Sequence, residues 1–173
     1  FALTLRTPGA DLDLVLGFLF AEGVIASAAD VISIRHCEPD TGEYPKGNRV
    51  RVELGDLVRV PSRLFRRQNT QHAGCGVCGK TALQDLRLYC APVGAGSGFE
   101  VAAEVLLGLP EAVGQRQPVF GATGGLHAVA AFDADGSFRD LAEDVGRHNA
   151  MDKLVGRALA LGQLPLSSSV VFF

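Results

Sequence analysis

The sequence contains no long uninterrupted run of apolar residues and no excess of basic residues. A helix that spans a membrane needs about 20 consecutive apolar residues, so the first absence excludes a membrane span. The chain has 16 Lys and Arg against 19 Asp and Glu, which gives a net charge of -3. Because a duplex-binding protein usually carries a basic surface, we also expect no nucleic-acid partner.

The sequence has four cysteines, and only one pair of them has C-x-x-C spacing. No secretory leader is recognisable, and the 47% of hydrophobic residues can build an ample core. In such a chain, metal binding, redox chemistry or catalysis is favoured over a disulfide framework. Cys37 and Cys90 lie in or beside apolar segments, so we expect both to be buried small hydrophobic residues.

Both ends of the chain fall within strand-like patterns. Residues 1–5 alternate between apolar and polar types, and residues 170–173 are all apolar. We therefore expect the chain to be a fragment of a longer protein, truncated at both ends. Helical and strand-like patterns mix along the chain, which favours an α/β sandwich.

Hydrophobic periodicity and turn residues predict the individual elements. Helices are expected over residues 12–25, 80–89, 101–113 and 147–161, and strands over residues 31–35, 50–54, 126–132 and 138–142. Residues 61–73 are polar and basic and are expected to form a linker, and residues 118–125 a glycine-rich connection. The helix at 147–161 has the clearest pattern, and Gly162 supplies its stop.

The segment Gly74–Thr81 reads Gly-Cys-Gly-Val-Cys-Gly-Lys-Thr and carries the most chemistry. Cys75 and Cys78 precede an expected helix, whose unpaired N–H groups and dipole favour a thiolate. Lys80 is close in sequence and adds positive charge. Because the glycines of this segment leave the sulfurs exposed, we expect a reactive pair of thiols.

Two uses of a reactive or metal-binding thiol pair fit this segment. Thioredoxin-like disulfide exchange uses C-x-x-C, but that motif normally follows an apolar strand, and residues 68–72 are polar. A zinc-stabilised binding module needs more than the two ligands that one C-x-x-C supplies. His72, Cys90 or His127 would have to complete such a site.

The same eight residues match the phosphate-loop pattern G-x-x-x-x-G-K-[ST], which raises the alternative of a nucleotide-binding enzyme. The strand expected at residues 128–132 is followed by Asp133, as in the strand that carries a magnesium-binding aspartate. However, a phosphate loop follows a buried apolar strand, and residues 66–73 are too polar for one. The match is therefore interpreted as accidental.

A second group of polar residues lies in the second half of the chain. Gly124, Gly125 and His127 open a strand, and residues 143–153 open the clearest helix. A capped helix with ordinary ion pairs would explain each residue singly. Together, so many charged and amide groups beside a glycine turn indicate a polar ligand site, where main-chain N–H groups suit a phosphate. The candidate residues of the helix are Arg147, His148, Asn149 and Lys153.

These segments resemble the formate dehydrogenase accessory sulfurtransferase family (FdhD). The resemblance rests on residues 75–80, on Gly124-Gly125-x-His127 and above all on the long block 143–153, and it spans the chain from about residue 8. Family members continue past the end of this chain with a stretch that contacts the guanine-nucleotide part of a cofactor. Many members also carry serines or threonines where this chain has residues 72–74.

The resemblance implies a cytoplasmic protein with a cytidine-deaminase-like α/β/α sandwich around a mixed sheet at residues 67–173, and a smaller N-terminal α+β part at residues 1–66. It implies sulfur relay from a cysteine desulfurase to the molybdenum bis-guanine-dinucleotide cofactor, which makes formate dehydrogenase competent. Cys75 would carry the persulfide, and Cys78 would be the partner thiol. The cofactor would be a bound substrate, and no permanently bound metal is expected. A homodimer is left open. The expected cofactor contacts are Gly124, Gly125, His127, Arg147, His148, Asn149 and Lys153.

Overall fold

The computed structural model describes residues 2–37, 47–62, 70–71 and 98–173 of the 173-residue chain. Within them, helices and strands mix, so the predicted α/β class is confirmed. Three small sheets are present in this part of the chain, with strand orders β1-β4, β2-β3 and β6-β5-β7. The strands of the first are parallel, whereas those of the other two are antiparallel.

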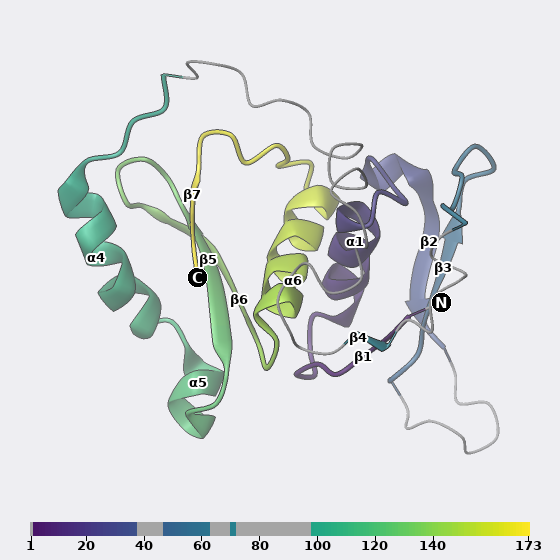
Figure 1. The fold of residues 1–173 in the computed structure, drawn as a ribbon, viewed down its shortest axis with the longest axis horizontal. Helices are drawn as coiled ribbons and strands as arrows, with labels where there is room; N and C mark the ends of the chain where they lie inside the picture. The colour runs from purple at the N-terminus through teal and green to yellow at the C-terminus, as the bar shows by residue number, and fades with distance from the viewer. Residues whose placement is uncertain (1, 38–46, 63–69, 72–97) are drawn as a thin grey trace.

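Two helices, α1 (Asp11–Ala21) and α6 (Arg147–Ala160), pack against each other in the middle of the molecule (Figure 1). Glycines allow this close approach. A Cβ on Gly17 would overlap the main-chain carbonyl of Asp152, and a Cβ on Gly156 would overlap that of Asp13. The boundary expected between the two parts of the chain at residues 66/67 stays a prediction. Helix α1 comes before this boundary in the sequence and α6 after it, and the two helices are in contact.

The outer side of α1 is covered by the hairpin of β2 (Val31–His36) and β3 (Val50–Leu54). The buried residues of this layer are Leu16, Leu19, Val24, Ile25 and Leu159, and partly buried side chains of both strands pack against them. The strand bounds agree with the sequence prediction to within one residue. Cys37 follows β2 and is half-buried rather than buried.

The other side of α6 is covered by β5 (His127–Phe132), β6 (Phe138–Asp144) and β7 (Val170–Phe172). Alternate side chains of β5 point to opposite faces of this sheet. Val129 and Ala131 pack in a cluster with Ala150 and Leu154 of α6. Ala130 and Phe132 pack instead with Leu109 and Val113 of α4 (Ala103–Gly114). The sheet is therefore sandwiched between α4 and α6, while the single mixed sheet of a deaminase-like domain stays a prediction.

Two short elements differ from the sequence prediction. Residues 118–125 were expected to be a glycine-rich connection, but Pro118–Thr123 forms the helix α5. Pro118 suits the first turn of a helix, and Gly124 ends it in the left-handed conformation with φ of 67°. The expected linker at 61–73 contains β4 (Thr70–Gln71), which pairs with β1 (Leu3–Thr4).

Among the described residues, no helix is both long and apolar enough to cross a membrane. Gly162 follows the last residue of α6 by two positions and adopts a φ of 67°, as predicted for the stop of this helix. The tight turn between β5 and β6 is closed by a hydrogen bond from Gly136 N to Asp133 O of 3.0 Å.

Candidate functional site

Asp144 is the centre of the polar residues that open α6. It ends β6, and its side chain is fully buried. Its Oδ1 accepts a hydrogen bond from the Gly146 N–H at 3.0 Å, at the point where the chain turns into α6. The N-cap residue of α6, Gly146, has no side chain that could cap the helix. The Oδ2 of Asp144 accepts a hydrogen bond from the main-chain N–H of Thr7 at 3.0 Å. One carboxylate therefore joins β6, the start of α6 and the N-terminal segment.

Lys153, in the second turn of α6, neutralises this carboxylate. Its Nζ lies 2.7 Å from Asp144 Oδ2, and the two side chains are 3% and 0% exposed. It also donates to the carbonyl oxygens of Thr7 at 2.8 Å and Glu143 at 3.2 Å. An ammonium has three N–H donors, so all of them are matched by acceptors inside the protein.

Asn149 is the third member of this group. Its Nδ2 donates to Asp144 Oδ1 at 2.9 Å and to the carbonyl oxygen of Leu5 at 2.7 Å. Its Oδ1 accepts from the Thr4 hydroxyl at 3.4 Å. We call Asp144, Asn149 and Lys153 the buried polar network. The side chains of Asn149 and Lys153 were predicted to contact the cofactor; in the structure their polar atoms bind the chain itself.

Arg147 and His148 differ from these neighbours because they face outward. Arg147 is exposed and His148 is half-buried. Burial lowers the pKa of His148, and the positive charge of Arg147 lowers it further, so the imidazole is neutral at neutral pH. No hydrogen bond or ion pair joins either side chain to another residue of the described part of the chain.

The glycine turn and His127 lie at the same end of the sheet as the start of α6. In the antiparallel pairing of β5 with β6, His127 is the partner of Asp144. Gly124 and Gly125 directly precede this strand and are exposed, as is His127. The structure therefore brings together two groups that are separated in the sequence, the glycine turn with His127 and the outward-facing Arg147 and His148.

Glu143 supplies a contact that sequence reasoning missed. Its carboxylate accepts hydrogen bonds from the main-chain N–H groups of Val119 at 3.1 Å and Phe120 at 2.7 Å. A carboxylate at this position stabilises the start of a helix, here α5. The only sequence signal was Pro118 at the helix start, because the capping residue lies more than twenty positions further along.

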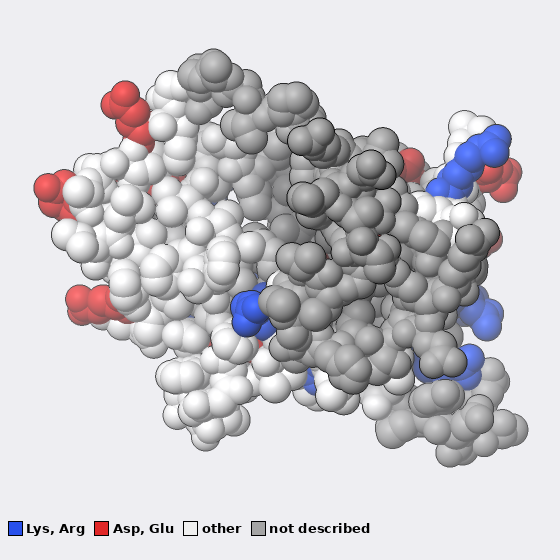
Figure 2. Space-filling view, in the orientation of Figure 1, with Lys and Arg blue, Asp and Glu red and all other residues white. Residues whose placement is uncertain are grey.

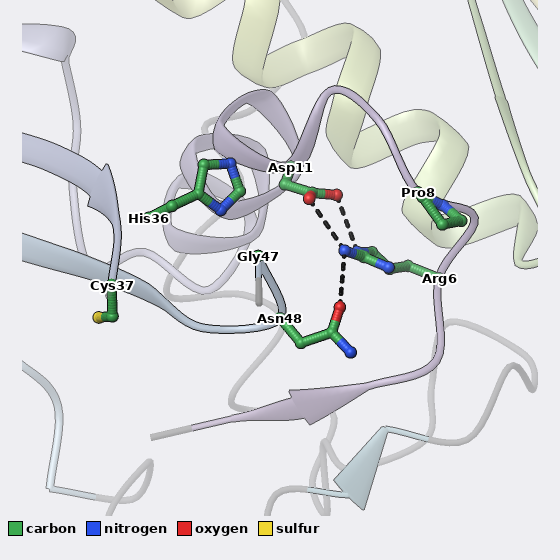
Figure 3. A pocket seen from close by; sticks show the side chains of 7 residues that line it. All are labelled: Arg6, Pro8, Asp11, His36, Cys37, Gly47 and Asn48. Carbon is green, nitrogen blue, oxygen red and sulfur yellow. Dashed lines mark hydrogen bonds and ion pairs between the residues drawn. The ribbon is translucent and has the colours of Figure 1, made fainter. Parts of the chain in front are cut away.

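Two cavities lie beside the N-terminal segment. One, of about 520 Å³, is lined by Thr7–Ala10, the start of α5, β6 and α6, and it includes Lys153 and Glu143. The other, of about 530 Å³, is lined by Arg6, Pro8, Asp11, His36, Cys37, Gly47 and Asn48 (Figure 3).

The charges of the second cavity are largely paired with each other. Arg6 Nε lies 2.8 Å from Asp11 Oδ1, and its Nη2 donates to Asp11 Oδ2 at 2.9 Å and to Asn48 Oδ1 at 3.1 Å. The sulfur of Cys37 points away from this group in Figure 3. These contacts fix Arg6 in place, on the side of the N-terminal segment that faces away from α6.

Several predicted site residues lie outside the described residues: Cys75, Cys78, Lys80 and with them the whole phosphate-loop match, as well as His72 and Cys90. The strand that was compared with a magnesium-binding strand is described, and β5 is antiparallel to both of its neighbours. Asp133 after it is paired with Arg139 at 2.7 Å. Phosphate-loop folds are built on strand–loop–helix units of parallel sheets, so this comparison loses its support.

Within the described residues, no group of three or more His, Cys, Asp or Glu side chains could hold a metal ion. On the face drawn in Figure 2, acidic side chains lie apart from one another along the α4 edge, and basic ones are scattered. The described part of that face has no continuous basic patch. Helix α4 also exposes apolar side chains, with Leu106 47% and Leu107 81% accessible.

Comparison with known proteins gives the following matches. The model of the FdhD/NarQ family matches residues 1–173. "Sulfur carrier protein FdhD" of Streptomyces coelicolor is 44% identical over 172 residues, which are 98% of this chain and 61% of that protein. The protein of the same name from Mycobacterium tuberculosis is 39% identical over 173 residues, 98% of this chain and 63% of the relative.

A crystal structure assigned as that of a formate dehydrogenase accessory protein from Desulfotalea psychrophila shares the fold. Its TM-score is 0.58 at 23% identity, and the likeness covers 96% of this chain and 56% of the other. The chain thus spans about three fifths of the length of the curated relatives that it matches.

Proposed function

Because this chain belongs to the FdhD/NarQ family, we propose that it is a sulfur carrier that serves formate dehydrogenase. In this proposal, sulfur arrives from a cysteine desulfurase and is held as a persulfide on Cys75. The protein then passes it to the molybdenum bis-guanine-dinucleotide cofactor, which is its substrate. The family match over all 173 residues carries the proposal, and the names of the curated relatives support it.

The two cysteines divide the chemistry between them. The thiolate of Cys75 attacks the outer sulfur of the desulfurase persulfide, so one S–S bond breaks, another forms and the desulfurase leaves as a thiolate. In the second step, the Cys78 thiolate attacks the inner sulfur of Cys75 and releases the outer sulfur at the sulfide level. A Cys75–Cys78 disulfide remains, and a cellular thiol must reduce it before the next cycle.

In this proposal, the surface at the start of α6 receives the anionic cofactor. Arg147 carries a positive charge, and the neutral imidazole of His148 can donate or accept a hydrogen bond. Gly124 and Gly125 allow close approach to the main chain beside His127. In this arrangement Asn149 and Lys153 act behind the surface, because their polar atoms are bound within the buried polar network.

This proposal includes the finer expectations for the whole protein. The cytidine-deaminase-like sandwich, a location in the cytoplasm and a homodimer belong to it as proposals. The zinc-module alternative is the competing function that the experiment below also addresses.

Mass spectrometry of the protein after incubation with a cysteine desulfurase and cysteine tests the proposal. We expect a gain of one sulfur atom that a thiol reductant removes and that disappears in Cys75→Ser. The Cys78→Ser variant should still load sulfur but release it slowly, because the second attack is lost. Loading of Cys75→Ser at the wild-type rate, or bound zinc without any gain of sulfur, would contradict the assignment.

A further inference from the structure

The N-terminal segment Thr4–Thr7 is held from two sides although most of it is not in a strand. On the side of α6, Asn149 binds the Leu5 carbonyl and the Thr4 hydroxyl, and Lys153 and Asp144 bind the main chain of Thr7.

The hydroxyl of Thr7 adds one more contact, because it accepts from the Val145 N–H at 3.0 Å. On the opposite side, Arg6 is fixed to Asp11 and Asn48, as Figure 3 shows. This segment therefore has little freedom to move relative to the start of α6.

The same segment continues into β1, and β1 pairs in parallel with β4. The register places Leu3 beside Thr70 and Thr4 beside Gln71. In the sequence, Gln71 stands four positions before Cys75. A continuous set of contacts thus leads from the buried polar network through residues 4–5 to the strand that directly precedes the cysteine segment.

We propose that the buried polar network positions β4 through β1, and that Asn149 is a positioning residue for the thiol chemistry of Cys75. This inference rests on the proposed function. It assigns Asn149 a role through the N-terminal segment, and the role requires no contact between its side chain and the cofactor. Asn149 is the member closest to β1, because Thr4 is itself the last residue of that strand.

The physical reason is that β1 and β4 are very short. Each strand has only two residues, and a pairing this short is not stable by itself. Its stability must come from the segments on either side of it. For β1, that support is a pair of hydrogen bonds with Asn149, whose Nδ2 donates to the Leu5 carbonyl and whose Oδ1 accepts from the Thr4 hydroxyl.

The test compares Asn149→Ala with Arg157→Ala as a matched control. Arg157 lies on the same helix and is also bonded across elements, with Nε 3.0 Å from Asp13 Oδ2 and Nη1 2.6 Å from Asp140 Oδ1. Its hydrogen bonds go to these two residues and not to residues 4–7. Loss of either side chain therefore weakens packing around α6, but only Asn149→Ala releases β1.

Three measurements are made on each variant: the melting temperature, hydrogen exchange of the peptides that contain Thr70–Gln71 and those of β5, and the pH profile of Cys75 alkylation. In Asn149→Ala we expect the exchange of Thr70–Gln71 to become about tenfold faster while that of β5 is unchanged. We also expect the midpoint of the alkylation profile to move. In Arg157→Ala, both should stay within about twofold of wild type even where the melting temperature falls equally.

The inference is overturned if Asn149→Ala, compared at equal distance below its melting temperature, leaves both the exchange and the alkylation profile as in wild type. If Asn149→Ala does not fold, Thr7→Val removes the hydroxyl contact to Val145 and should produce the same changes in smaller degree; their absence in a folded Thr7→Val would also overturn it. Sulfur loading is measured in parallel. A wild-type protein that loads no sulfur refutes the proposed function, whereas the exchange result still decides the positioning role.

Discussion

Asp152 is predicted to make the protein less stable as the pH rises from about 4 to 7. Burial and, to a smaller extent, the negative charge of Glu22 at the end of α1 together raise the pKa of this carboxyl from its usual 3.8 to about 7. The folded state thus holds a proton that the unfolded state has lost over this range of pH. Because the folded state binds more protons, the free energy of unfolding falls with pH and levels off above the folded pKa.

The magnitude follows from the shift. Three pKa units at about 1.4 kcal/mol each give a loss of roughly 4 kcal/mol between pH 4 and pH 8, as an upper value. Asp152→Asn keeps the size of the side chain and removes its titration. We expect the variant to resemble wild type near pH 4 and to be more stable by about 2–4 kcal/mol at pH 8.

Urea unfolding of both proteins at pH 4, 5, 6, 7 and 8 measures this difference, since other titrating groups contribute equally to each. Asp135→Asn is the control, because Asp135 is exposed and hydrogen bonds from Ser137 lower its pKa. That variant should show no gain in stability at pH 8. If the stability difference between Asp152→Asn and wild type is the same at pH 5 and pH 8, Asp152 does not carry a proton at neutral pH and the reasoning is refuted.

Two further predictions concern α6. Gly156→Ala should cost about 1–3 kcal/mol of unfolding free energy, because the added methyl would overlap the Asp13 carbonyl. The control Gly108→Ala on α4 adds a methyl that meets no other atom, and it should stabilise the protein by about 0.5–1 kcal/mol. Equal effects of the two changes in urea unfolding would refute the close packing of α1 on α6. Arg147→Ala should change the melting temperature little and slow sulfur delivery, whereas Lys153→Ala should cost about 3–5 kcal/mol by leaving the Asp144 charge unpaired in the interior. A stably folded Lys153→Ala, or normal delivery by Arg147→Ala, would contradict this division of roles.

The sequence predicted those helices and strands that a hydrophobic pattern within the element itself specifies. The apolar run of β5 and the helical repeat of α6 were both read correctly, and the bounds differ from the prediction by at most one residue. The helix α5 was missed because its N–H groups are satisfied by Glu143, which is distant in the sequence. The strand β4 was missed because two polar residues give no period, and its pairing partner β1 lies near the start of the chain.

The sequence also predicted one part of the candidate site and missed another. The sequence indicated that the glycine turn and the start of α6 form one polar region, and the pairing of His127 with Asp144 places them together. It could not show which of the polar residues face inward. Asn149 and Lys153 have the spacing of an exposed pair on one helical face, and they are buried because residues 4–7 cover them. Asp144 was not among the predicted site residues, although it binds both.

The buried polar network is better explained by geometry than by stability. An ion pair such as Lys153–Asp144 in the interior adds little to stability, because the loss of hydration offsets most of the attraction. Apolar side chains of similar size could hold α6 to β6 at least as firmly. They could not, however, bind the carbonyl oxygens of Leu5 and Thr7 or the N–H of Thr7, which belong to a segment without a complete sheet partner. Irregular main chain can be fixed in the interior only by groups that satisfy its hydrogen bonds. The polar side chains are therefore needed where the N-terminal segment crosses the start of α6, which is the position from which β1 reaches β4.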